Sequence, residues 1–274
     1  MKKLLLLLVV LFLVAGSANA AMVLHYEMDS ADDFAVGTGS GQPDQGWNGR
    51  LYVDNKVTGA TYAAMTSTAG IVYDATEGAV YMDGVHPCKI AGAEDAAAVI
   101  GISTQYTFSL WAKGDKSAVS GGGYSFYLKT SSGNFKCDLS WNPANAATFT
   151  SPGGGWQSSA YGIWDPANTS KYVDPETWNM YTFVWDTDNS FVGTYVNGIL
   201  RASMVGGTAL AAGATITEYG FGDGFGWAGP GGWYKDYKVF DEALDADAVL
   251  ALVPEPATIA LLGFGALALI RKRK

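Results

Sequence analysis

Short stretches in which apolar and polar side chains alternate dominate the middle of the chain. In residues 106–113 the apolar side chains share one face, and Trp111 lies on the opposite face with Thr107 and Ser109. A period of two residues is typical of a strand with one buried face. Further strands are predicted at residues 23–28, 79–84, 124–130, 134–141, 178–186, 191–196, 199–204, 216–221 and 233–240.

Turn residues separate these strands and fix how they connect. Asn197-Gly198 is the pair that a two-residue hairpin turn requires, because both positions need a positive φ. Asp245 is an N-cap candidate for one short terminal helix whose apolar side chains could pack against the sheets. The 35 glycines and 15 tyrosines favour many short strands joined by tight turns. The pattern predicts an all-β fold, an antiparallel two-sheet β-sandwich of about a dozen strands.

Three stretches show a weaker pattern. Residues 52–73 are expected to hold one or two weak strands, and the alanine-rich residues 91–99 favour a short helix or a loop. Residues 143–175 form a long insertion, rich in glycine, alanine and tryptophan, with little periodic order. We therefore assign no strands or helices to this insertion.

The first twenty residues read as a secretory signal peptide. A basic start precedes a wholly apolar core, Leu4 to Val14, and Ala18-Asn19-Ala20 supplies the small residues that a signal peptidase needs. Cleavage is predicted after Ala20. A first transmembrane helix is disfavoured by the short apolar core and by the small residues that follow it. The chain is therefore expected to be exported.

The last twenty-one residues have an equally ordered composition. Pro254-Glu255-Pro256 favours an extended chain, Ala257 to Ile270 is uncharged, and residues 271–274 are all basic. This order closely resembles the PEP-CTERM sorting signal of exported bacterial proteins. The resemblance implies transient retention in the inner membrane, processing by an exosortase near Pro254, Glu255 and Pro256, and release to the cell surface or extracellular matrix. The alternatives are a permanent anchor or a buried helix, but about 14 apolar residues are fewer than the ~20 that span a bilayer.

Residues 21–252 remain as one domain, between the signal peptide (1–20) and the sorting tail (254–274). Two of the 17 basic residues lie in the signal peptide and four in the terminal cluster, and one of the 26 acidic residues, Glu255, lies in the tail, which leaves 11 basic against 25 acidic residues. A net charge of about −14 offers no basic patch for phosphates and argues against nucleic-acid binding. Such a charge fits a soluble extracellular surface.

Four motifs in the predicted domain resemble laminin-G-like, concanavalin A-like jelly rolls. They are YTFSLWAK at 106–113, the WNMYTFVWDTDNSFVGTYVNGIL hairpin at 178–200, WYKDYKVFDEALDADAVLAL at 233–252 and YMDG at 81–84. Asn197 stands where these proteins usually have Asp, and the insertion at 143–175 departs from their pattern. The resemblance implies a jelly-roll sandwich. It also implies one calcium ion, for which Asp29, Asp83 and Asp236 are the candidate ligands because they lie at strand ends or on the matching motifs.

Cysteine and histidine supply little further chemistry. Export permits a disulfide between Cys88 and Cys137, the only cysteines, and two buried thiols are the alternative. Two cysteines and two histidines, far apart in the chain, are too few for a zinc site.

The pattern of acidic residues argues against catalysis. A glycosidase on this fold needs paired carboxylates across a groove, and the sequence has no Glu-x-Asp-x-Glu array on a strand. No Gly-x-Ser-x-Gly nucleophile elbow is present either. We therefore expect a domain that is not an enzyme.

The aromatic residues suggest carbohydrate as the ligand instead. Trp111 lies opposite the apolar face of its strand, and Trp141, Trp156, Trp164 and Trp227 lie in or beside loops. Of these, Trp111 and Trp227 are the predicted ligand-binding residues. We expect an exported, non-catalytic domain that binds polysaccharide or another surface component. A purely structural matrix protein and a glycan hydrolase are the alternatives.

Overall fold

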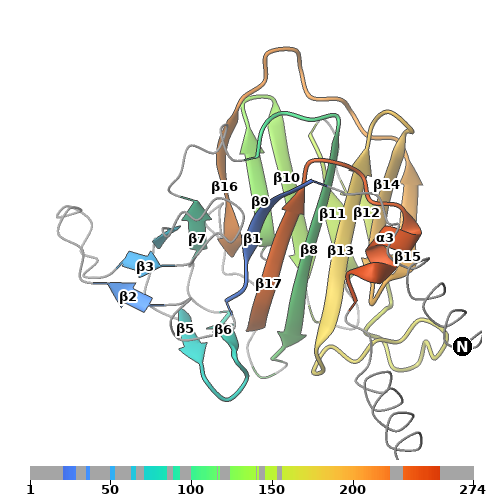
Figure 1. Ribbon diagram of the computed structural model, residues 1–274. Coiled ribbons are helices and arrows are strands. Elements are labelled where there is room, and N and C mark those ends of the chain that lie inside the picture. The colour runs from blue at the N-terminus through green and yellow to red at the C-terminus, as the bar shows by residue number, and fades with distance from the viewer. Residues whose placement is uncertain are drawn as a thin grey trace, which may run out of the picture.

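The computed structural model describes residues 21–28, 35–37, 50–52, 63–65, 71–84, 89–92, 100–115, 117, 124–139, 141, 146–152, 156–222 and 231–253. Within these residues nearly all regular structure is β-strand, and the strands form two antiparallel sheets that pack face to face (Figure 1). The predicted β-sandwich is confirmed. Signal peptide and sorting tail both lie outside the described residues.

The first sheet has eight strands. In spatial order they are β15 (Ile199–Val205), β14 (Phe191–Val196), β13 (Asn179–Asp186), β8 (Gln105–Gly114), β17 (Gly232–Phe240), β6 (Ala79–Met82) and β5 (Ile71–Asp74), with β1 (Met22–Tyr26) paired to β17. The chain's best alternating segment thus becomes a central strand, β8, which pairs with β13 on one side and β17 on the other. The terminal strands β1 and β17 lie side by side (Figure 1).

The second sheet has nine strands. In spatial order they are β12 (Trp156–Tyr161), β11 (Ala146–Thr150), β10 (Gly133–Leu139), β9 (Tyr124–Thr130), β16 (Ile216–Gly222), β7 (Lys89–Gly92), β4 (Ala63–Met65), β3 (Arg50–Tyr52) and β2 (Ala35–Gly37). No elements were assigned to residues 143–175 from the sequence, and β11 and β12 fall inside this insertion. Ladder pairing to β10 orders β11, and β12 then pairs with β11, although neither segment has clear alternation.

The core lies between the sheets and is largely aromatic. Phe108 of β8 contacts Phe126 of β9 with ring centroids 4.5 Å apart, and Phe135 of β10 meets Trp185 of β13 at 4.8 Å. All the apolar residues predicted for one face of residues 106–113 are fully buried. Large aromatic side chains dominate the burial energy of such a core.

A second, smaller cluster lies on the outer face of the first sheet. The helix α3 (Ala246–Ala251) is capped by Asp245, whose side chain accepts a hydrogen bond from the Ala248 amide at 2.8 Å. Val249 of α3 and the preceding Leu244 pack over β13 and β14. This covering segment explains why Thr107 is buried on a face predicted to be polar: its hydroxyl accepts a hydrogen bond from the Leu244 amide at 2.9 Å. The predicted cap and helix are confirmed.

Candidate functional site

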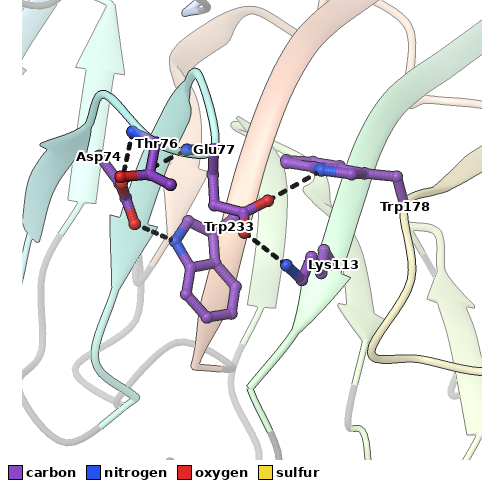
Figure 2. A network of polar contacts seen from close by, with 6 residues as sticks. All are labelled: Asp74, Thr76, Glu77, Lys113, Trp178 and Trp233. Atoms are coloured by element: carbon purple, nitrogen blue, oxygen red, sulfur yellow. Dashed lines mark hydrogen bonds and ion pairs between the residues drawn. The ribbon is translucent and has the colours of Figure 1, made fainter.

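Beyond α3, the outer face of the first sheet carries a concentration of tryptophan at one end. β17 begins where β8 ends, and Trp233 of β17 pairs with Tyr81 of β6 on one side and with Lys113 of β8 on the other. Trp178 directly precedes β13, whose first residue pairs with Ala112, the neighbour of Lys113. Three elements far apart in the sequence therefore bring two indole rings and a lysine together (Figure 2).

Trp111 belongs to the same face. It lies two residues before Lys113 on β8 and pairs with Lys235 of β17, which lies two residues after Trp233. Because side chains two apart on a strand point the same way, these four side chains share the outer face. Each of them is neither fully buried nor fully exposed. We call Tyr81, Trp111, Trp178 and Trp233, with Lys113 and Lys235, the tryptophan surface.

The tight turn between β5 and β6 supplies the first carboxylate of this surface. Asp74 closes β5, and its Oδ1 accepts hydrogen bonds from the Thr76 amide at 2.9 Å and the Glu77 amide at 3.4 Å. Its other oxygen, Oδ2, accepts the Trp233 indole N–H at 2.8 Å. The indole hydrogen bond is the main reason why the pKa of Asp74 is lowered. Asp74 thus stabilises the turn and fixes one tryptophan at once.

Glu77, from the same turn, fixes the second tryptophan. Its Oε1 lies 2.6 Å from the Lys113 ammonium, and its Oε2 accepts the Trp178 indole N–H at 3.2 Å (Figure 2). Lysine ammonium groups cover one face of each ring: Lys113 Nζ is 4.8 Å from the Trp233 centroid, and Lys235 Nζ is 4.4 Å from that of Trp178. Both rings are therefore held at their N–H edge by a carboxylate and at one face by a cation.

Tyr81 extends the surface at its β6 side. Its ring centroid lies 5.0 Å from that of Trp233, and its hydroxyl donates to Asp115 Oδ2 at 2.9 Å. Burial first, then the hydrogen bond and charge of Asp115, raise the pKa of Tyr81 to about 12. The phenol therefore stays neutral at physiological pH.

The structure does not bring the predicted calcium ligands together. Asp236 forms a bulge of β17 at φ 55° and pairs with His25 at 2.6 Å and Lys238 at 2.7 Å. Asp83 follows β6 near the start of β17, about five residues from Asp236 and so roughly 16 Å away along the strand. One ion cannot bridge that span, because calcium–oxygen distances are about 2.3–2.6 Å. The third candidate, Asp29, lies outside the described residues.

The other described residues form no cluster of metal-ligating side chains either. Those residues contain no group of three or more histidine, cysteine, aspartate or glutamate side chains that could hold an ion. Asp83 and Asp236 therefore do not fit the single shared calcium site that the sequence analysis predicts. Calcium bound by other residues stays a prediction.

The predicted disulfide is not formed at Cys137, which is free and fully buried. Cys137 shares the inward face of β10 with Phe135 and Leu139, so its thiol acts as a small apolar group in the core. Burial raises the pKa of this thiol well above its usual value. Cys88 lies outside the described residues.

The tryptophans divide between the core and the surface. Trp141 and Trp164, which lie beside predicted loops, are buried against each other with centroids 5.4 Å apart. Of the two predicted ligand-binding residues, Trp111 lies on the tryptophan surface and Trp227 is outside the described residues. Sequence reasoning missed Trp178, Trp233 and Tyr81. The alternation around Trp233 offered a signal, since Tyr234 follows it with opposite parity and is fully buried.

A model of the laminin-G-type family described as the concanavalin A-like lectin/glucanases superfamily matches residues 92–250, more than half of the chain. The chain belongs to this superfamily. The resemblance noted from four sequence motifs is thereby confirmed. The family match starts at residue 92, whereas the sandwich already begins with β1 at Met22.

Solved structures of low sequence identity share this fold. Domain 4 of AbnA, an extracellular arabinanase of Geobacillus stearothermophilus solved with arabinotriose, has a TM-score of 0.52 and 18% identity over 86% of this chain and 100% of that domain. The binding domain of botulinum neurotoxin DC, in complex with SialylT, has a TM-score of 0.51 and 13% identity, and the match covers 86% of this chain and 51% of that one. The binding domain of botulinum neurotoxin serotype D has a TM-score of 0.52 and 13% identity, with 87% of this chain and 52% of that one covered. The chain thus spans about half of each neurotoxin domain. No curated protein matches it.

The C-terminal segment matches a second family. Residues 252–274 match the PEP-CTERM protein-sorting motif, which confirms the resemblance and indicates export. Among the described residues, no helix is long and apolar enough to cross a membrane. The tail itself lies beyond them.

Proposed function

We propose that this exported superfamily member is a non-catalytic carbohydrate-binding protein of the cell surface or matrix, and that it holds polysaccharide on the tryptophan surface. The observation that carries the proposal is the fixation of two indole rings on one sheet face by Asp74 and Glu77. The family match and the PEP-CTERM motif support the location, with an exosortase as the processing partner.

The geometry suits a sugar ring better than an ion or a peptide. Aromatic side chains offer flat apolar faces with a negative quadrupole, against which the C–H groups of a sugar can stack. Trp111, Trp178 and Trp233 are partly exposed and come from adjacent or nearly adjacent strands. Because Trp178 and Trp233 are held before a ligand arrives, little side-chain entropy is lost on binding. Ordered rings of this kind favour a rigid, repeating ligand.

The ligands of structural neighbours agree with this class. The arabinanase domain was solved with arabinotriose and a neurotoxin binding domain with SialylT. At 18% and 13% identity these neighbours share the fold only, so the residues that would contact sugar here are proposed from this chain's own geometry.

We assign Asp74 and Glu77 to positioning and not to acid–base catalysis. Glycoside hydrolysis requires one carboxylic acid that can give its proton and a second carboxylate with access to the sugar. Asp74 accepts the Trp233 N–H and its pKa is lowered, which is the wrong direction for a general acid. Glu77 is occupied by Lys113 and Trp178. The surface therefore has binding groups without the catalytic pair.

Titration against a panel of polysaccharides tests the proposal. Trp233→Ala and Trp111→Ala should each weaken binding about tenfold, equivalent to ~1.4 kcal/mol. Tyr161→Ala, at an exposed aromatic residue of β12, is the matched control and should bind as the parent does. Trp227→Ala tests the remaining sequence prediction. Binding that is unchanged in both Trp111→Ala and Trp233→Ala would refute this surface as the site, and hydrolysis of any polysaccharide would refute the non-catalytic assignment.

A further inference from the structure

The edge strand β15 exposes apolar side chains where the folded domain ends. β15 is the outermost strand of the first sheet, and α3 lies beside it (Figure 1). We call the exposed apolar residues there the edge patch: Ile199 (54% exposed), Leu200 (44%), Met204 (45%) and Val205 (89%) of β15, with Leu250 (54%) of α3. Edge strands are normally protected by charged residues or by a covering element. Exposed apolar groups that cluster in this way indicate a docking surface.

The charge of this region differs from that of the rest of the body. Residues 197–205 and 248–253 contain a single charged side chain, that of Arg201, in a body with a net charge of about −14. The carboxylates of α3, Asp245 and Asp247, lie at its start. An acidic protein is repelled by anionic lipid, so an apolar edge with few charges is the side that can approach a bilayer.

The sorting tail leaves the domain beside this patch. Val253 and Leu250 lie against the turn before β15, since a Cβ placed on Gly198 would be 3.3 Å from Val253 Cγ2 and 2.7 Å from Leu250 Cδ1. Only Pro254-Glu255-Pro256 separate Val253 from the uncharged run that starts at Ala257. Four residue steps span at most roughly 13 Å. Once the tail enters a membrane, Val253 is held within that distance of the bilayer, and the end of the edge patch formed by Ile199 and Leu250 lies beside it.

Because the uncharged run 257–270 is short, its insertion should draw the domain closer to the bilayer. As an inserted helix, about 14 residues would span about 21 Å at 1.5 Å per residue, against a hydrocarbon thickness of ~30 Å. A short segment is accommodated by thinning the bilayer or by pulling its flanks into the interface. The flank on this side is Pro254-Glu255-Pro256, and Leu250 to Val253, which adjoin the patch, come directly before it.

We propose that the edge patch docks on the lipid bilayer while the sorting tail is inserted, so that the domain lies on the membrane by its β15 edge before processing. The proposal is independent of the carbohydrate ligand and rests on tail insertion. Docking at β15 would point the opposite edge of the sheet outward. Two to five strand spacings of ~4.8 Å would then hold the tryptophan surface roughly 10–24 Å above the membrane, free to bind polysaccharide.

Fluorescent labelling of the full chain in vesicles of phosphatidylethanolamine and phosphatidylglycerol tests whether the edge patch docks on the bilayer. An environment-sensitive dye is attached at Leu200→Cys or, as the matched control, at Val72→Cys on β5, an exposed apolar residue (53%) at the opposite edge of the same sheet. Both labelling variants also carry Cys88→Ser, and Cys137 is buried, so the dye attaches only to the introduced cysteine. We expect blue-shifted emission at position 200 and several-fold more quenching there than at 72 by lipids with a nitroxide near the headgroup, because interfacial side chains lie ~5–10 Å deep.

A charged variant separates the patch from the tail. In Ile199→Glu combined with Leu200→Glu, a dye at Met204→Cys should lose its lipid quenching, while flotation with the vesicles persists through the tail. Equal quenching at 200 and 72, or quenching at 204 that survives both glutamates, would overturn the proposal. A blue shift at 200 without lipid quenching would mean that two copies pair through β15 instead. If the full chain does not float with the vesicles, the sorting tail is not inserted, and the proposal is overturned as well.

Discussion

The turn that joins β14 to β15 tests how closely α3 packs against the edge of the first sheet. Asn197 and Gly198 adopt φ values of 52° and 75°, as the hairpin prediction requires. A Cβ on Gly198 would lie 2.7 Å from Leu250 Cδ1 and 3.0 Å from Leu250 Cα. Gly198→Ala therefore places a left-handed alanine in the turn and drives a methyl group into α3.

The two costs can be separated with a second glycine. A left-handed backbone costs a non-glycine residue roughly 1–2 kcal/mol, and forcing a methyl group against a packed backbone atom costs about 1–3 kcal/mol more. Gly213 has nearly the same φ, 78°, but no heavy atom within 4 Å of its Cβ position. Gly213→Ala should therefore show the first cost alone, and Gly198→Ala should be less stable than Gly213→Ala by about 1–3 kcal/mol.

Urea unfolding followed by tryptophan fluorescence measures this difference, with equal m-values required for the comparison. For a domain of this size, each kcal/mol corresponds to a change in Tm of roughly 2–4 °C. Leu250→Ala in the Gly198→Ala background removes the Leu250 Cδ1 methyl group but leaves the new methyl group pressed against the helix backbone, so it should restore only part of the loss. Equal destabilisation by the two glycine substitutions would refute the close packing of α3 against this turn.

Three further predictions concern Asp236, calcium and Cys137. Burial alone would raise the pKa of Asp236, but hydrogen bonds and charges of His25 and Lys238 outweigh it and lower that pKa. Its stabilising effect should therefore be full above the unfolded pKa of about 3.9 and be lost as pH falls through the lower folded value. Asp236→Asn should flatten this part of the stability curve, measured by urea unfolding from pH 5 downward; an unchanged slope would contradict it. Isothermal titration of the chelated protein tests calcium, and any heat should survive Asp236→Asn because that carboxylate is already paired. Reducing agent should leave Tm unchanged, because Cys137 is free; a lower Tm would contradict this.

Local sequence pattern predicted most of the central strands. The alternation at 106–113 identified β8 and its buried face, and Asn197-Gly198 identified the β14–β15 turn, because both signals depend on residues next to each other in the chain. β11 and β12 were missed, since their order comes from ladder hydrogen bonds to β10 and not from their own periodicity. The same limit applies to Thr107, which is buried by a segment far along the chain.

The candidate site was likewise predicted only where local sequence pattern decides it. Parity placed Trp111 on the outer face, but only the register of β8, β17 and β6 brings Trp233 beside Lys113 and Tyr81. The acidic turn between β5 and β6 was not singled out from the sequence. Its carboxylates reach two tryptophans 159 and 101 residues away along the chain, and no local pattern encodes that distance.

Sequence alone determined the fold class and the sorting motif, and it predicts the signal peptide, because periodicity, turn residues and apolar runs act within a few residues. Tertiary structure decided which tryptophans face the core, which carboxylates hold the others, and that the sorting tail leaves the domain beside an apolar edge. These features depend on strand order in the two sheets. Contacts between distant segments form only when burial of the aromatic core aligns those strands, so they become visible only in the folded chain.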